Sequence, residues 1–112
     1  MPVFSVLDVG VILVDSIPGS IATLTASGEL ESVNRRSLEY FGKSIDELKN
    51  WATNDVIHPD DLRDVIEAFK RGVASGEPFE YDNRSRRSDG ICRWHHGRFH
   101  PQRDEAGQIV RW

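Results

Sequence analysis

Cysteine is almost absent from this sequence: Cys92 is the only one in 112 residues. No disulfide can form within the chain, so the cysteine content gives no sign of an oxidising compartment. Long hydrophobic runs are missing too, since no stretch approaches the roughly 18–20 apolar residues of a membrane-spanning helix. The apolar stretch from Val9 to Val14 is short, and it lacks the basic start and cleavage pattern of a signal peptide. We therefore expect a cytoplasmic chain with no direct membrane insertion.

A surplus of positive charge is also missing. The formal net charge of −4 argues against a general nucleic-acid binder, so we expect no nucleic-acid partner. Hydrophobic residues make up 38% and charged residues 29%, which is typical of one globular domain with one core. Several arginines gather near the C-terminus, where they could meet an acidic partner, although such a stripe is more often the solvated face of a sheet. They are Arg84, Arg86, Arg87, Arg93, Arg98 and Arg103.

What is present, in residues 77–112, is a set of three strand-like segments joined by two turns. Asp89-Gly90 is a strong hairpin signal, because glycine adopts the positive φ that a tight turn requires. A longer polar turn follows at 103–108, with Gly107 near its end. Two successive hairpins form a meander, which needs apolar cover on one face. The rest of the chain is expected to supply that cover.

The chain before the meander predicts a hairpin and then a helix. Residues 21–34 contain two short strand-like segments around a polar turn. From Arg35 the hydrophobic period becomes helical, with Leu38 and Phe41 on one face. Gly42 can end this short helix in a left-handed conformation.

Two further helices are expected. Ser44 and Glu47 form a capping box, in which the serine caps the backbone and the glutamate three residues later reaches back. Pro59 suits the first turn of the longest helix, and Gly76 stops it. The apolar stripe of this helix comprises Leu62, Val65, Ile66, Phe69 and Val73.

This order of elements predicts an α+β fold: a five-stranded antiparallel sheet with three helices packed on one face. Residues 3–17 precede that core as a flanking segment. Their apolar spacing fits a helix stripe, while Gly10 and the Val-Ile-Leu-Val run fit a strand equally well. Helix and strand both stay open for this segment.

Three histidines in the meander invite a metal-site interpretation, but strand geometry argues against it. His95 and His96 are neighbours in a strand, so they face opposite ways. His96 and His100 share a face but lie about 13 Å apart at roughly 3.3 Å per residue, which is too far for one metal ion. We expect no metal site there.

Asp60 and Asp61 could be interpreted as paired carboxylates for acid–base catalysis. Adjacent residues of a helix point in different directions, and the helix dipole explains carboxylates at a helix start. No Ser/His/Asp or Cys/His spacing supports nucleophilic catalysis either. We expect no catalytic residue and no enzyme activity within the chain.

Several different short motifs follow one another along the chain. They are Ser27–Leu30 with Val33-Asn34, Tyr40–Gly42 with Ser44–Leu48, His58–Asp61, and the C-terminal set Arg87–Gly90, Arg93-Trp94, Pro101, Asp104, Gly107 and Val110–Trp112. In this order and spacing they resemble a PAS domain, with the C-terminal set resembling the PAC motif. The resemblance covers Asp15 to Trp112. It divides the chain into an N-terminal flanking and dimerisation segment, 1–17, and a PAS domain, 18–112, whose final strand is cut short at Trp112.

The resemblance implies a sensory or regulatory signalling module of the subgroup common in bacterial two-component sensor histidine kinases. Any kinase or cyclase activity would then lie in a parent protein, outside these residues. PAS domains commonly hold a small ligand between the helices and the inner sheet face, and they relay a packing change to an effector domain. The same side chains could instead fill the core, leaving a pure homodimerisation or protein-interaction module with no ligand. The pocket candidates are Phe41, Leu48, Trp51, Leu62, Ile66 and Phe69.

The identity of any ligand or cofactor stays open, but the resemblance argues against two. Haem sensors of the family take an axial histidine from a helix or loop that faces the pocket. The longest helix here has none, and His58, directly before Pro59, suits a helix cap. Light-sensing members carry their reactive cysteine in an Asn-Cys-Arg-Phe-type motif on a helix, whereas Cys92 lies in a predicted strand. We therefore expect neither haem nor a covalent flavin.

Many PAS domains dimerise through the outer face of the sheet and an N-terminal flanking segment. Residues 3–17 contain the stretch from Val9 to Val14, which is too apolar to remain solvated and has no place in the five-stranded core. We expect them to pack against the outer sheet face of a second subunit, which gives a two-fold homodimer.

Overall fold

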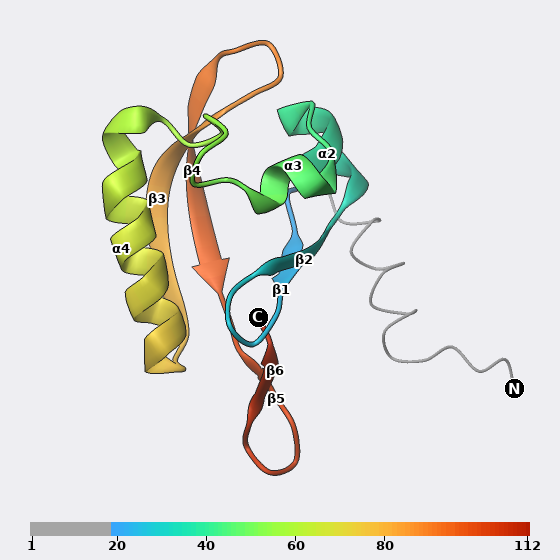
Figure 1. Ribbon diagram of the computed structural model, residues 1–112, viewed down its shortest axis with the longest axis vertical. Coiled ribbons are helices and arrows are strands. Elements are labelled where there is room, and N and C mark those ends of the chain that lie inside the picture. Colours follow the sequence, from blue (N-terminus) through green and yellow to red (C-terminus); the bar gives the residue numbers. More distant parts are fainter. Residues whose placement is uncertain (1–18) are drawn as a thin grey trace, which may run out of the picture.

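The computed structural model describes residues 19–112, so the predictions made for segment 3–17 and for the division at residue 17 lie outside the described residues. The described chain contains three helices and six strands (Figure 1). The predicted α+β class is confirmed. In chain order the elements are β1 (Ala22–Leu24), β2 (Leu30–Val33), α2 (Arg35–Phe41), α3 (Ile45–Lys49), α4 (Pro59–Ser75), β3 (Phe79–Arg86), β4 (Cys92–Phe99), β5 (Gln102–Arg103) and β6 (Ile109–Arg111).

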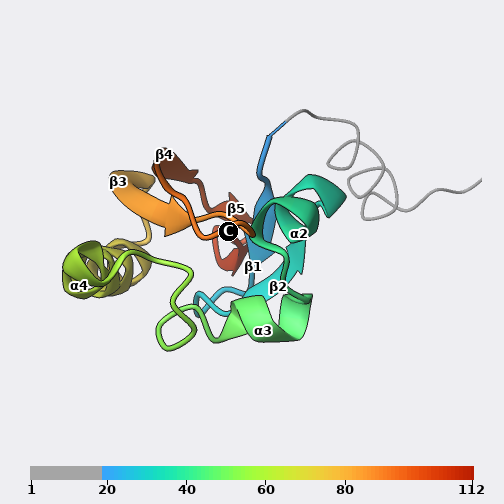
Figure 2. The same ribbon diagram turned by 90° about the horizontal axis from the view of Figure 1, so that it is seen from above.

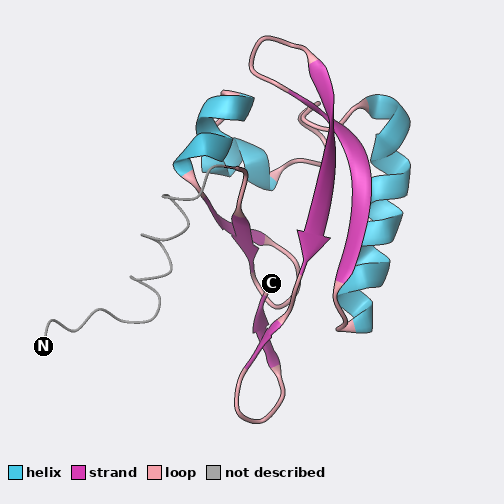
Figure 3. Cartoon of the chain, turned by 180° about the vertical axis from the view of Figure 1, so that it is seen from behind, coloured by secondary structure: helices cyan, strands magenta, loops and turns pink. Residues whose placement is uncertain are grey.

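The strands form three antiparallel pairs rather than the single five-stranded sheet that the sequence predicts. β1 pairs with β2, β3 with β4, and β5 with β6, whose hairpin extends away from the rest (Figure 3). The first pair is connected to the last by the bridge between Thr25 and Arg111 and by two backbone hydrogen bonds of 2.9 Å that Leu24 and Trp112 exchange. The middle strand of the meander, expected over residues 91–100, is present as β4. A separate short strand, β5, follows Pro101, which has no N–H to donate to a ladder.

The helix boundaries follow from local capping. Asn34 caps α2, and Gly42 ends it with a φ of 62°. The predicted capping box of α3 is present, since Ser44 and Glu47 each accept a hydrogen bond from the other's backbone N–H. His58 caps α4 by accepting a hydrogen bond from Asp60 N at its Nδ1 (3.1 Å), which is the role expected for this histidine.

The helices lie in two groups around the strands. Seen from above (Figure 2), α4 lies next to β3, whereas α2 and α3 lie next to β1 and β2. Phe69 of α4 packs edge-on against Phe79, with ring centroids 6.1 Å apart. A side chain at Gly72 would meet the Phe79 ring at 2.4 Å, so glycine is required for this close approach. The small apolar core consists of Leu24, Leu48, Val56, Val65 and Trp112.

Candidate functional site

A cavity of about 240 Å³ lies between the helices and the inner face of the β3–β4 pair. Its walls come from β1, β2, α2, α3, α4, β3 and β4, and from the loop before α4. Aromatic rings provide much of the lining, and these are Phe41, Trp51, Phe69, Tyr81 and Phe99. Such a mostly apolar space between elements is the usual form of a small-molecule site.

Four of the six pocket candidates from the sequence lie on this cavity: Phe41, Leu48, Trp51 and Phe69. The structure does not place Leu62 and Ile66 among the lining residues. The reason is that α4 runs along β3 at the side of the sheet and reaches the cavity only through Phe69.

Sequence reasoning missed the floor of the cavity, which β3 supplies. Tyr81, Asn83 and Ser85 alternate along this strand and face the cavity. A signal for these residues was present in the sequence. Successive side chains of a strand face opposite ways, so polar residues at every second position of the predicted strand could have been recognised as facing the cavity. They place hydrogen-bonding groups at the bottom of an otherwise apolar site.

Asn83 and Ser85 are the polar centre of the floor. Their exposed fractions are only 7% and 8%. Asn83 Nδ2 donates to Ser85 Oγ at 2.9 Å, while no residue in the range 19–112 donates to Asn83 Oδ1. No buried side-chain polar atom of the described residues lacks a partner, so Asn83 Oδ1 is at least partly accessible, and it can accept from a ligand that carries an O–H or N–H group.

The cavity wall carries no formal charge within the described chain. Among the described residues that line it, Tyr81 is the one ionisable side chain, and burial raises the pKa of Tyr81 to about 12, so the phenol is neutral. A carboxylate or phosphate entering the cavity would lose its hydration without gaining a counter-charge. The site is therefore suited to uncharged molecules.

A model of the PAS fold family matches residues 30–112. The chain belongs to this family. One curated relative is the peroxide stress-activated histidine kinase mak1 of Schizosaccharomyces pombe. The two sequences are 34% identical over 90% of this chain. The match spans only 6% of that kinase. The PAS domain described here thus corresponds to a small part of such a relative.

Solved structures share the fold. The N-terminal domain of a diguanylate cyclase with PAS/PAC sensor from Marinobacter aquaeolei superposes with a TM-score of 0.65 at 21% identity, over 80% of this chain and 84% of that one. The PAS domain of a protein from Colwellia psychrerythraea gives 0.69 at 19% identity, over 95% and 90%. The chain thus has the PAS fold in sequence and in structure, and it is similar to a segment of a histidine kinase. Among residues 19–112, no helix is both long and apolar enough to cross a membrane.

The two histidines of β4, His95 and His96, lie on opposite faces of this strand, as strand geometry predicts. His95 is hydrogen-bonded to the Tyr40 hydroxyl at 3.0 Å, and its burial lowers the pKa of the imidazole. His96 lies on the opposite face, where its Nδ1 is 2.6 Å from Asp82 Oδ1. Within the described part of the chain, no three metal-ligating side chains are grouped closely enough to hold a metal ion. Neither histidine nor Cys92 lines the cavity.

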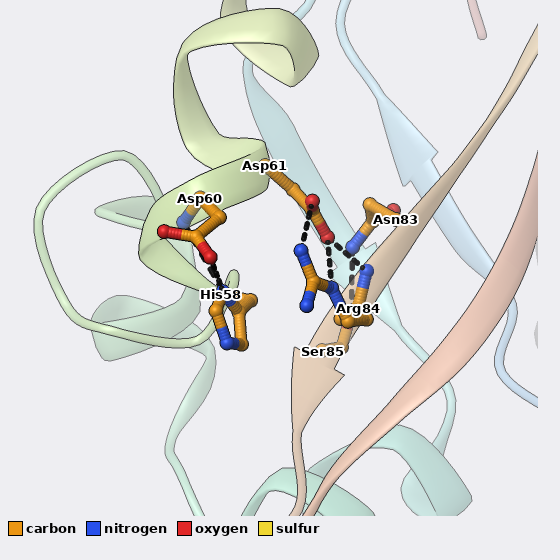
Figure 4. Close-up of polar contacts among 6 residues, drawn as sticks. All are labelled: His58, Asp60, Asp61, Asn83, Arg84 and Ser85. Carbon is orange, nitrogen blue, oxygen red and sulfur yellow. Dashed lines mark hydrogen bonds and ion pairs between the residues drawn. The ribbon is translucent and has the colours of Figure 1, made fainter.

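Asp60 and Asp61 diverge at the start of α4 (Figure 4). Asp60 lies toward His58, at 3.9 Å. Asp61 receives the Arg84 guanidinium in a two-pronged contact, with Nη2 at 2.7 Å and Nε at 2.9 Å, and also the Arg84 backbone N–H at 2.8 Å. The sequence predicted the divergence but not the arginine, which lies 23 positions away. This contact ties the start of α4 to β3.

The contact makes a pH prediction. The hydrogen bonds from Arg84 lower the pKa of Asp61 from 3.8 to about 2. A lowered carboxyl pKa contributes stability that is fully present above pH 3.8 and is lost as the pH falls toward 2. Asp61→Asn should therefore lower the free energy of unfolding at pH 7. Between about pH 4 and pH 2 the free energy of unfolding of the variant should fall less steeply than that of the wild type, which chemical unfolding at each pH measures.

The difference between the wild-type and variant curves isolates this contribution. Asp89 also has a pKa of about 2, because Arg87 hydrogen-bonds its carboxylate, and it titrates in the same range in both proteins. Parallel curves for the two proteins would show that the Asp61–Arg84 contact carries no pH-dependent stability.

Proposed function

We propose that this PAS domain is a cytoplasmic sensory module of a two-component signalling protein. It binds a small uncharged molecule in the cavity and relays the resulting packing change to an attached effector domain. One observation carries the proposal: a single cavity of about 240 Å³ touches seven of the nine described elements. A ligand in it would contact the β1–β2 and β3–β4 pairs and all three described helices at once. The similarity to a histidine kinase supports such an effector.

The ligand class follows from size and charge. The cavity is smaller than the usual 300–1,000 Å³ of drug-sized sites, and its wall is uncharged. We propose a compact ligand with an apolar or aromatic body and one hydrogen-bond donor, which faces Asn83 Oδ1. Haem and a covalent flavin do not suit this site, because no histidine or cysteine of residues 19–112 lines it.

Native mass spectrometry tests this proposal. Gently purified intact protein is expected to carry an added small mass that disappears on denaturation, because a molecule that binds only the folded protein stabilises it. The same sample should show no absorption band of haem or flavin. A clean apo mass from several expression hosts would count against a ligand sensor.

A homodimerisation module without ligand is the second candidate, and exposed apolar side chains favour it. Trp94 is 67% exposed on the face of β4 opposite the cavity, and Ile91 and Val110 are also exposed. Exposed apolar groups of this kind often mark an interface. In this alternative, light scattering shows a dimer and native spectra show no ligand.

The N-terminal flanking segment gives this alternative a direct test. Deletion of residues 1–16 is expected to convert the dimer to a monomer if that segment packs on the outer face of a second subunit. A deleted protein that stays dimeric, or an intact protein that is monomeric at high concentration, would assign the segment another role.

A further inference from the structure

The outer edge of β3 is paired along only part of its length. At its end, Arg84 O accepts from His58 N at 2.9 Å, and Arg86 N donates to Val56 O at 2.8 Å. Arg84 N donates to the Asp61 carboxylate. The loop before α4 and the first turn of α4 thus close the edge beside residues 84–86.

The register shows which backbone groups remain. Because Arg84 directs both its N–H and its C=O away from β4, Arg84 and Trp94 are a non-hydrogen-bonded pair. Such pairs recur at every second residue of an antiparallel ladder, and the β3–β4 register runs without a shift. The N–H and C=O groups of Glu80 and Asp82 therefore also point outward. Within residues 19–112, none of these four groups has a partner.

A groove of about 430 Å³ lies beside this free edge, between β3 and the middle of α4. Four carboxylates line it, those of Asp61, Asp64, Glu67 and Asp82, against one guanidinium, that of Arg71. Arg84 pairs with Asp61 and Arg63 pairs with Glu67. Among the described lining residues, Asp64 and Asp82 keep carboxylates without a guanidinium partner, against the one guanidinium of Arg71. The groove is thus both a strand-pairing edge and an acidic surface.

The exposed Trp94 ring at the groove adds a cation site. The Arg84 guanidinium already lies over this ring, 5.0 Å from its centroid. Two thirds of the tryptophan stays exposed, so the ring can accept a second cation.

We propose that this edge binds a short extended segment of a partner protein that carries alternating lysine or arginine side chains. The segment adds as a strand beside Glu80 and Asp82, and its cations lie against Asp64, Glu67 and Trp94. A second copy of the same edge is disfavoured, because it would bring Glu80 and Asp82 against the same two acidic residues. This proposal is independent of any ligand in the cavity.

The test uses the intact chain and a fluorescein-labelled peptide, Lys-Val-Arg-Val-Lys, followed by fluorescence anisotropy. Two N-methylated versions block alternate sets of peptide N–H groups while they preserve charge. In strand addition only one set faces the edge, so one version should bind about tenfold more weakly than the other. A peptide with glutamate at the basic positions should not bind.

Matched variants on the protein complete the test. Asp82→Pro removes the outward N–H without touching the ladder to β4, whereas Asp82→Val removes the same carboxylate and keeps the N–H. Asp82→Pro should bind the peptide roughly tenfold more weakly than Asp82→Val, with both shown to be folded by their NMR spectra. Asp64→Lys should also weaken binding. Equal binding by the two methylated peptides, or by the two Asp82 variants, would overturn the proposal. It would be overturned equally if light scattering showed a dimer that Asp82→Pro alone dissociates, since the edge would then belong to a second copy.

Discussion

Replacing Asn34 by alanine should lower the free energy of unfolding by about 3 kcal/mol, the largest loss we expect from a single polar residue. Asn34 is 1% exposed. Its Oδ1 accepts hydrogen bonds from Ile21 N at 3.2 Å and from Ser37 N at 3.1 Å, and its Nδ2 donates to Gly19 O at 2.5 Å. One side chain therefore caps α2 and ties the entry of β1 to it.

The size of the effect follows from adding two costs. Loss of an asparagine helix cap costs about 1 kcal/mol, and leaving buried backbone groups unpaired costs about 1–3 kcal/mol more. Ser44→Ala is the matched control, because Ser44 caps α3 at an exposed position and should lose only about 1 kcal/mol. Chemical unfolding gives the free energy of unfolding of both variants and of the wild type. A smaller loss for Asn34→Ala than for Ser44→Ala would show that the buried network around Asn34 carries little stability.

Truncation of Phe69 to alanine is expected to cost about 3–4 kcal/mol. The ring packs against Trp51, Phe79 and Phe99, with centroid distances of 5.5, 6.1 and 5.9 Å. It also forms one wall of the cavity, so its removal enlarges an existing void instead of allowing collapse. We expect the variant to bind larger uncharged molecules than the wild type does.

The control for Phe69 is Val110→Ala, which truncates an exposed apolar side chain and should change stability by less than about 0.5 kcal/mol. Thermal and chemical unfolding give both values. A loss below about 1 kcal/mol for Phe69→Ala would show that this face of α4 does not pack on the sheet.

Features that depend on residues close in sequence were predictable. The capping box at Ser44 and Glu47 and the cap at His58 are present. The Asp89-Gly90 turn is present too, with a φ of 87° at Gly90. In each case the deciding hydrogen bond spans two to four residues, so local chemistry alone selects the structure.

Features that depend on distant residues were not predictable. Nothing near Asp61 in the sequence indicates that Arg84 will lie beside it. Likewise, the separation of the β3–β4 pair from the β5–β6 pair at Pro101 depends on which distant strand pairs with the chain on each side of the proline. The placement of Leu62 and Ile66 outside the cavity depends on the position of α4 along β3, which a helical stripe does not specify. Asn83 and Ser85 became candidates only once β3 was seen to face the cavity.

An NMR titration tests the central claim most directly, that the cavity receives a small uncharged molecule. The intact PAS domain is titrated with 2-naphthol, which has an aromatic body and one O–H donor, and separately with its charged counterpart 2-naphthoate. We predict saturable backbone amide shifts for 2-naphthol at Ser37, Asn83 and Ser85, and none for 2-naphthoate. Asn83→Leu should weaken 2-naphthol binding, because it removes the free amide oxygen. Equal shifts from both compounds, or shifts confined to the outer face around Trp94, would contradict the account.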